Sequence, residues 1–246
     1  MHWVNFTIQS DFAAFRDPTT TTCRVAVYIP PKSSIIGLIG AVLGEQWVTR
    51  GVFSPGMVKL FKNVKIGVKI DNPELPEKIK FTTKHTALPK SGKGKPILFK
   101  EELLVDPQFT IIAASEDNEV IKELATAIKN HTPKFAPFLG AAFCLARLEF
   151  VAEGSSSKIV PVSETFTTKY AVSFMPDSFR PHIGAKAIVE GHNLYQVDGD
   201  RLVPKYNSLV MPVNGVIEVD RFSPPGPLSG DFIKLSSDDE EIVNVF

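Results

Sequence analysis

An apolar stretch with regularly spaced glycines, residues 30–44, constrains the fold more than any other part of the sequence. Two prolines end an extended segment there, and a nearly uninterrupted apolar run follows, which predicts a helix that is buried on most sides. Gly37, Gly40 and Gly44 recur at intervals of three and four residues and therefore share one face of this helix. Each glycine costs the helix roughly 1 kcal/mol relative to alanine. We therefore expect a strand or another backbone to pack closely against that face.

The start of the same helix carries hydroxyl and amino groups. Ser33 and Ser34 offer N-cap hydroxyls, and Lys32 lies beside them. Because the first N–H groups of a helix lack partners within the helix, this end is a candidate phosphate site. The alternative is a core helix with an ordinary cap.

The composition is that of a globular protein with a sizeable core: 43% of the 246 residues are hydrophobic. The sequence has no run of about 18 apolar residues, and its N-terminus lacks the order of a signal peptide, so we expect a cytoplasmic protein with no membrane partner. Cys23 and Cys144 are far apart and form no CxxC pair, which argues against a disulfide framework and against a zinc site.

The net charge of zero conceals a strong asymmetry along the chain. Residues 1–100 carry fifteen Lys and Arg against six Asp and Glu, whereas residues 101–246 carry twelve against twenty-one. A neutral total argues against a free-standing, nonspecific nucleic-acid binder. The basic half nevertheless indicates contact with phosphates or with an acidic partner.

The hydrophobic periodicity predicts an α+β fold. Strands are expected at residues 3–9 and 64–70, a strand pair within residues 99–115, a helix at residues 117–130 and a strand at residues 141–151. Together with the glycine-spaced helix, the order is that of a ferredoxin-like βαββαβ unit. Such a unit leaves one face of its sheet free, and RNA-recognition domains bind RNA on that face.

A lysine-rich segment lies between the second and third predicted strands. Residues 78–100 contain seven lysines and no Asp, Glu or Arg, and their alternating pattern predicts a projecting β-hairpin. Lys90, Lys93 and Lys95 fall at its tip. Tips of this kind are often only solubilising loops, but this one belongs to the longest basic stretch of the chain, so we favour contact with nucleic acid.

A serine-rich segment, residues 154–157, marks an expected boundary. It separates a first domain, residues 1–153, from a C-terminal region, residues 154–246, of short β segments divided by Pro and Gly. The C-terminal region is expected to be a small β-rich appendage rather than a separate catalytic domain.

The sequence holds little that indicates catalysis or cofactor binding. The five histidines show no metal-ligand spacing, and no nucleotide-binding glycine loop occurs, so we expect neither a metal nor a cofactor. Lys84 and His85 form the one pair that could serve acid–base cleavage of RNA, with Lys84 stabilising the phosphorane charge. The sequence indicates no third group that would complete such a site.

Three segments together resemble a known family: residues 12–18, residues 30–44, and residues 132–140 with Cys144 after them. The second has the prolines, serine and glycine-spaced helix, and the third has the Pro-basic-x-x-Pro-aromatic-Leu-Gly pattern, of CRISPR-associated protein family five. Members of this RAMP family are subunits of type I Cascade complexes. The C-terminal third carries no matching motif.

The resemblance implies both a fold and a set of partners. It implies a ferredoxin-like domain with a protruding thumb hairpin, here residues 76–100, and a C-terminal β region. It further implies that the chain caps the 5′ handle of the CRISPR RNA in antiviral defence and contacts the family-seven backbone subunit and the large subunit. Target DNA would be met only indirectly, through the complex.

The resemblance and the basic stretch together give a set of candidate site residues. Those expected near RNA are Arg16, Arg24, Lys32, Ser33, Ser34, Lys84, His85, Lys90, Lys93 and Lys95. Those expected to be structural are Gly37, Gly40, Gly44, Leu139 and Gly140.

One branch of the family cleaves repeat RNA without metal, using a tyrosine near the end of the first helix together with a lysine and a histidine. Residues 41–47 of this chain contain no tyrosine, so the expected role is a non-catalytic RNA-binding scaffold, with a separate family-six endoribonuclease processing the RNA. Two alternatives stay open. One is a metal-independent endoribonuclease that uses Lys84 and His85, and the other is an unrelated protein-interaction module.

Overall fold

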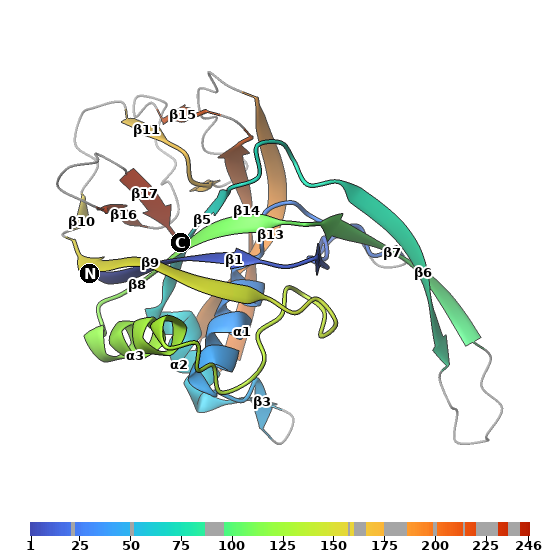
Figure 1. Cartoon of the computed structure of the whole chain (residues 1–246), viewed down its shortest axis with the longest axis horizontal. Helices are drawn as coiled ribbons and strands as arrows, with labels where there is room; N and C mark the ends of the chain where they lie inside the picture. Colours follow the sequence, from blue (N-terminus) through green and yellow to red (C-terminus); the bar gives the residue numbers. More distant parts are fainter. Residues whose placement is uncertain are drawn as a thin grey trace.

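The structure is a computed structural model that combines helices with strands that occur along the whole length of the chain (Figure 1). It describes residues 1–20, 23–49, 52–86, 96–156, 158–159, 166–174, 186–198, 201–213, 215–219, 231–235 and 242–246. The helices are α1 (Lys32–Leu43), α2 (Pro55–Asn63) and α3 (Asn118–Lys129). The α+β class predicted from the sequence is confirmed.

The centre of the molecule is a four-stranded antiparallel sheet in the order β5-β8-β1-β9. Its strands are β1 (His2–Gln9), β5 (Lys65–Ile70), β8 (Gln108–Ser115) and β9 (Arg147–Ser155). Alternation along β1 directs Val4, Phe6 and Ile8 to one face, where all three are fully buried.

The last strand of this sheet begins later than the sequence predicts. Residues 141–151 were expected to be strand, but β9 starts at Arg147 and continues through Ser155. Residues 137–146 instead fold back on themselves, since Leu139 N–H donates to the Cys144 carbonyl at 2.8 Å and Ala146 N–H to the Pro137 carbonyl at 2.9 Å. These bonds satisfy the local backbone without a neighbouring strand.

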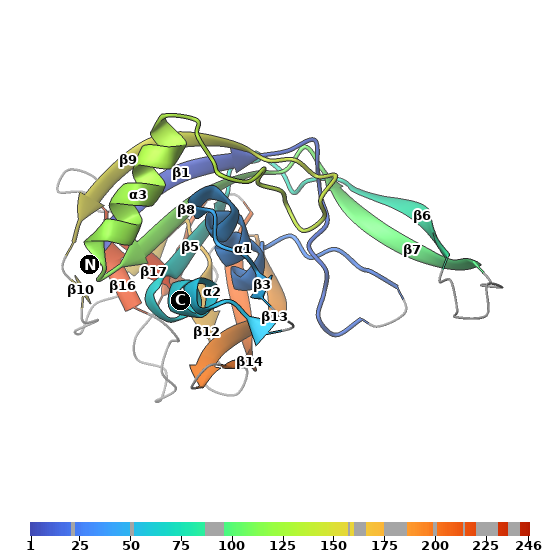
Figure 2. The same ribbon diagram turned by 90° about the horizontal axis from the view of Figure 1, so that it is seen from below.

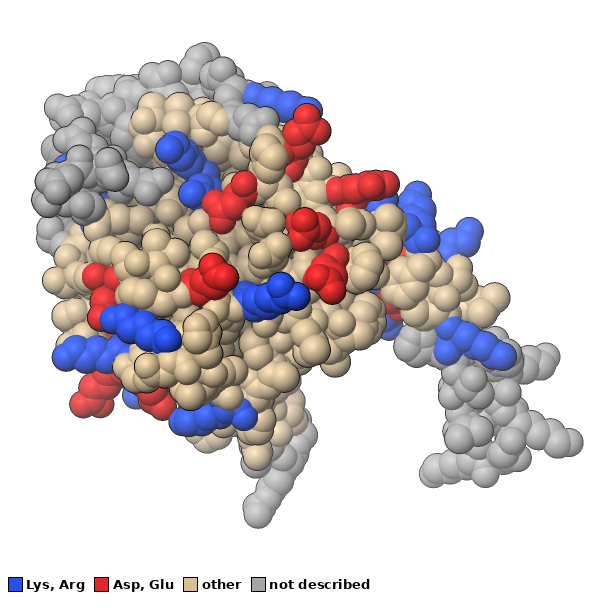
Figure 3. Space-filling model, in the orientation of Figure 1, with Lys and Arg blue, Asp and Glu red and all other residues tan. Residues whose placement is uncertain are grey.

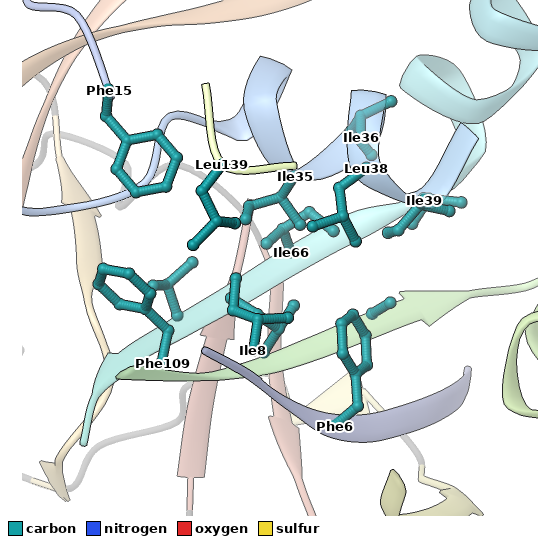
Figure 4. Packing of buried hydrophobic residues seen from close by; sticks show 14 of the residues in the cluster. Phe6, Ile8, Phe15, Ile35, Ile36, Leu38, Ile39, Ile66, Phe109 and Leu139 are labelled. Carbon is teal, nitrogen blue, oxygen red and sulfur yellow. The ribbon is translucent and has the colours of Figure 1, made fainter. Parts of the chain in front are cut away.

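Helices α1 and α3 both pack on the face of the sheet that carries Phe6 (Figure 2). Ile35 and Ile39 of α1 lie over Phe6 and Ile8 of β1, with Phe15 and Leu139 beside them (Figure 4). The stripe predicted for α3 is buried here as well, at Ile121, Leu124 and Ile128. One hydrophobic core therefore joins both helices to the sheet.

The ends of α1 differ in part from expectation. Its N-cap is Pro31, with no side-chain cap, so Ser33 and Ser34 lie inside the first turn and the predicted serine cap is wrong. At the other end Gly44 adopts φ +81°, a left-handed conformation that favours glycine, and ends the helix.

Helix α2 is an element that the sequence prediction does not contain. Ser54 caps it by accepting the Met57 N–H at 3.1 Å, and Pro55 occupies its first turn. Met57, Leu60 and Phe61 form its buried face. A helix of nine residues with so few apolar positions gives only a short periodic signal.

The opposite face of the sheet is partly covered by the C-terminal region, where Trp3 and Ile112 pack against Tyr170, Ile233 and Val243. The covering strands are β10 (Lys158–Ile159), β16 (Asp231–Lys234) and β17 (Ile242–Val245). The terminal residue Phe246 also exchanges two backbone hydrogen bonds with Ile66 of β5, at 3.1 and 3.2 Å. The expectation of a free sheet face is therefore wrong for the part of the face that carries Trp3 and Ile112.

Strands β6 (Lys78–Thr86) and β7 (Pro96–Val105) form an antiparallel ribbon that projects from the body (Figures 1 and 2). The short strand β2 (Phe12–Ala13) pairs with the base of β7. β7 and β8 are separated at Asp106 and Pro107, and they belong to different sheets, so the expectation that the strands within residues 99–115 form a pair is wrong.

The remaining strands form small sheets. They are β3 (Val48–Thr49), β4 (Val52–Phe53), β11 (Phe166–Thr168), β12 (Val172–Phe174), β13 (Ala187–Asp198), β14 (Arg201–Pro212) and β15 (Ile217–Val219). The long hairpin β13–β14 packs against α1 and α2. In the part of the chain that the structure describes, no helix is long and apolar enough to cross a membrane.

Candidate nucleic-acid interface

A groove of about 740 Å³ runs along the outer face of α1. Its floor consists of α1 residues that recur at helical spacing and are mostly small: Ser33, Ser34, Gly37, Leu38 and Ala41. One wall comes from Trp47, Phe53, Met57 and Phe61, the other from Phe135, Ala136, Phe138 and Gly140. The groove therefore joins small floor residues to aromatic walls.

The glycines of α1 make room for side chains rather than for a backbone. A Cβ atom on Gly37 would lie 3.1 Å from the Trp47 ring, and one on Gly40 would lie 2.6 Å from the Met57 sulfur. The indole of Trp47 also packs edge-on against Phe53 and Phe61, with ring centroids 5.6 and 5.9 Å apart. The prediction that a strand or backbone approaches this stripe is thus wrong, and the glycines instead position one wall of the groove.

The other wall is held by the end of α1. Phe135 N–H donates to the Ala41 carbonyl at 2.9 Å, and Lys134 N–H to the Val42 carbonyl at 3.1 Å. Carbonyls in the last turn of a helix lack the usual N–H partner one turn on. The bond from Lys134 therefore supplies a partner to the Val42 carbonyl, and the bond from Phe135 adds to the Gly44 N–H, which donates to the Ala41 carbonyl at 3.3 Å. They fix the segment that carries Phe135, whose side chain is half exposed.

The predicted phosphate site at the start of α1 has an unusual lysine. Lys32 is only 8% exposed. Burial, and secondly the nearby Lys65, lowers the pKa of Lys32 to about 8. Lys32 is therefore a buried amine rather than a surface cation, whereas the half-buried Ser33 and Ser34 line the groove directly.

The base of the β6–β7 hairpin brings Arg24 next to the basic strands. Arg24 Nη1 lies 2.5 Å from Oε1 of Glu101, a carboxylate that also accepts the Thr83 hydroxyl at 3.0 Å. The guanidinium lies over the Phe99 ring, 5.6 Å from its centroid. Arg24 is thus largely committed to a structural ion pair, although its side chain remains 40% exposed.

Two lysines of β6 also have partners at the hairpin base. Lys78 Nζ donates to the Ala26 carbonyl at 2.5 Å and lies 3.9 Å from the centroid of the Tyr28 ring. Lys80 lies 3.6 Å from the Glu102 carboxylate but is mostly exposed. Lys84, further out on the same strand, is exposed.

The other predicted RNA residues fall into two groups. Arg16 is exposed and donates to the Thr20 carbonyl at 2.7 Å, in a loop that bridges to Ala26 beside the hairpin base. His85 lies in β6, but its side chain is outside the described part of the structure. Lys90, Lys93 and Lys95 lie outside the described residues altogether. The structure thus collects Arg16, Arg24 and Lys84 around the hairpin and places the serines in the groove.

Figure 3 shows lysine or arginine side chains on the projecting hairpin, while acidic and basic side chains are interspersed over the body. Among the described residues, no group of three His, Cys, Asp or Glu could hold a metal ion.

Leu139 and Gly140, predicted to be structural, anchor the loop that contains β2. Leu139 is buried, and its carbonyl accepts the Ala14 N–H at 3.0 Å. Gly140 has φ +82°, and a Cβ atom there would lie 2.2 Å from the Ala14 carbonyl oxygen. Only glycine allows this close approach of two backbones.

The aromatic side chains of the groove are the feature that sequence reasoning missed. Trp47 directly follows the predicted helix, and Phe135 and Phe138 fall in the third resembling segment, but their positions along the chain do not indicate that they line one groove. The sequence feature that could have indicated the groove is the presence of the aromatic residues Trp47, Phe135 and Phe138 outside the predicted hydrophobic stripes.

A family model described as CRISPR-associated protein (Cas_Cas5) matches residues 3–219. A chain of a structure titled "CRISPR RNA-guided surveillance complex" superposes with a TM-score of 0.52 at 16% identity, covering 91% of this chain and 94% of the other. A second structure, of a CRISPR protein from Archaeoglobus fulgidus, gives a TM-score of 0.52 at 15% identity, covering 100% of this chain and 98% of that one.

No curated protein sequence matches the chain significantly. At such low identities the two structural matches establish a shared fold, while the family model extends over most of the chain, including the glycine-spaced helix, the hairpin and the central sheet. The chain therefore belongs to the Cas5 family of CRISPR-associated proteins.

Proposed function

We propose that the chain is a non-catalytic RNA-binding subunit of a type I CRISPR effector complex. In this role it binds the 5′ handle of the CRISPR RNA and caps the filament of family-seven backbone subunits, in contact with the large subunit. The proposal rests on family membership and on the basic residues gathered at the hairpin.

The observation that carries the proposal is the β6–β7 hairpin. A two-stranded ribbon that projects from the body cannot bury its outer faces against the core. Lys84 is exposed on this ribbon and therefore contributes little to the stability of the fold. Exposed cations on a projecting ribbon attract a phosphate backbone without reading its sequence. The lysines expected at the tip extend the same positive charge.

The proposed architecture follows the family pattern. The sheet β5-β8-β1-β9 with α1 and α3 corresponds to the ferredoxin-like unit, expected at residues 1–153, although β9 continues two residues further, to Ser155. The β6–β7 hairpin corresponds to the thumb, at about residues 76–100. The residues that follow β9 correspond to the C-terminal β-rich region.

A gel-shift series tests RNA binding. The full chain is titrated with labelled repeat RNA that contains the 5′ handle, in EDTA, over a range of salt concentrations. Each phosphate contact contributes roughly 0.7 to the slope of log affinity against log salt for single strands, so Lys84→Gln should reduce the slope by about that amount. The matched control is Lys122→Gln, an exposed lysine on α3, which should leave both affinity and slope unchanged.

Charge reversal at Lys90, Lys93 and Lys95 together should weaken handle binding much more than Lys84→Gln. Unchanged affinity in this triple variant would remove the hairpin from the interface. The same gels detect cleavage, and cut products in EDTA that disappear in His85→Ala would replace the scaffold role by endoribonuclease activity. Failure to bind either RNA or the backbone subunit would favour an unrelated protein-interaction module.

A further inference from the structure

We propose that the groove along α1 holds an unpaired nucleobase of the bound RNA, inserted between its two aromatic walls. This inference rests on the proposed function, since it assigns a base-binding site to the same ligand. The hairpin would hold the phosphates, and the groove would take a base out of the strand.

The exposure of the aromatic rings favours a flat ligand. Trp47 is 41% exposed, Phe135 50% and Phe138 41%, although all three line one groove. Large aromatic side chains that stay this exposed in one groove have apolar ring surface available for stacking. Unpaired bases of single-stranded RNA bind proteins by stacking on such rings.

The polar groups of the groove match the edge of a base. Ser33 and Ser34 lie at one end of the floor, and Glu45 and Gln46 follow the other end of α1. Hydroxyl, carboxylate and amide groups can donate to or accept from the Watson–Crick edge of a base. A base has two apolar faces and a polar edge. The aromatic walls of the groove suit the faces, and the polar groups at the ends of its floor suit the edge.

Charge argues against a phosphate in the same place. Glu45 is the one charged residue among the described lining residues, and a carboxylate repels an anion. A volume of about 740 Å³ lies within the usual range for small-molecule sites, so a base with part of its ribose fits. The groove has no cation among its described lining residues. Phe143, in the same segment as Phe138 and Gly140, packs on Phe81 at the hairpin base, so the groove suits a base and the hairpin suits the backbone.

The inference depends on the position of Trp47, which Gly37 permits. Because a Cβ atom at residue 37 would lie 3.1 Å from the indole, the ring rests directly on the helix backbone. The chain has two tryptophans, and Trp3 is buried in a different cluster. The fluorescence difference between the wild type and Trp47→Phe therefore reports on the groove.

The experiment, on the full chain, compares a handle oligonucleotide with abasic oligonucleotides of the same length and charge, each of which lacks the base at a single position. The natural RNA should quench Trp47 emission, and one of the abasic RNAs should bind roughly 5- to 100-fold more weakly, as expected for one stacked base. Trp47→Ala and Phe135→Ala should lose affinity for the natural RNA by a similar factor without changing the salt slope. Trp47→Phe should retain most of the affinity because it keeps a ring.

Tyr206→Leu serves as the matched control, since Tyr206 is an aromatic residue that is 49% exposed and does not line the groove. RNA binding by the wild type with equal affinity for every abasic oligonucleotide and unchanged Trp47 emission would overturn the inference while leaving the proposed function intact. Groove variants that bind RNA normally but no longer assemble with the protein subunits would also overturn it, because the occupant would then be an apolar side chain of a partner. If the wild type binds no RNA at all, the proposed function itself fails.

Discussion

One carboxylate joins the β13–β14 hairpin to the segment that leads into α1. Glu190 accepts the backbone N–H groups of Tyr28 and Ile29, each with a nitrogen–oxygen distance of 2.8 Å. Its side chain is only 13% exposed, and His192 lies beside it, 3.6 Å away. Glu190 therefore connects two parts of the chain that are more than 160 residues apart.

Truncating this side chain should be among the more destabilising single changes. Glu190→Ala leaves two partly buried N–H groups without their acceptor, and a hydrogen bond to a charged group contributes about 1.5–3 kcal/mol. The expected loss in the free energy of unfolding is about 3–5 kcal/mol. For a chain of this size that corresponds to a fall in Tm of roughly 6–20 °C.

Thermal and urea unfolding, followed by circular dichroism, would measure the loss. Glu190→Gln should lose less than Glu190→Ala, because the amide oxygen can still accept one of the two bonds. Asp198→Ala is the control: this carboxylate is exposed on the same strand and should change stability by less than about 0.5 kcal/mol. If Glu190→Ala is as stable as Asp198→Ala, water replaces the carboxylate and the two segments are not coupled through it.

Three further predictions concern single residues. Gly140→Ala should lower the free energy of unfolding by about 2–4 kcal/mol, because its Cβ meets backbone. Gly44 has a similar positive φ but a flexible lysine side chain as its neighbour, so Gly44→Ala should lower it by about 1 kcal/mol, and equal losses would contradict the role of the backbone contact. The pKa of Lys32 is lowered to about 8, so the unfolded chain binds more protons above that pH, and stability should rise between pH 8 and 10.5 by up to about 3 kcal/mol; this rise should vanish in Lys32→Met. Burial raises the pKa of Cys144 to about 11, so a thiol reagent at pH 8 should modify the exposed Cys23 and reach Cys144 only after unfolding, as mass spectrometry would show.

Local patterns were sufficient to predict the elements of the core. The alternation along β1 and the stripe of α3 depend only on which face each residue occupies, and both lie within one residue of the predicted limits. The glycine-spaced helix likewise ends at Gly44, where the backbone needs a positive φ. Short-range periodicity and end signals determine these features.

The partners of those elements could not be predicted in the same way. The sequence indicates that the glycines of α1 leave space, but not that Trp47 and Met57 fill it. Helix α2 gives too short a pattern to be recognised, and residues 137–146 fold back through backbone bonds that have no sequence signature. The groove depends on the packing against the glycines, on α2 and on residues 137–146, so only the tertiary structure reveals it.

The positive charge of the first hundred residues also could not be interpreted from the sequence alone. Part of that charge is committed to contacts within the fold: Arg24 pairs with Glu101, Lys69 lies 3.1 Å from Asp71, and Lys78 contacts a carbonyl and an aromatic ring. Under the proposed function, releasing these cations to bind RNA would break contacts that stabilise the fold, so the phosphate contacts should instead involve exposed cations such as Lys84 and the lysines expected at the tip, which lie outside the described residues. The salt dependence of RNA binding should therefore reflect about three or four contacts, a slope near −2 to −3, rather than the roughly −6 that the whole excess of nine positive charges would give.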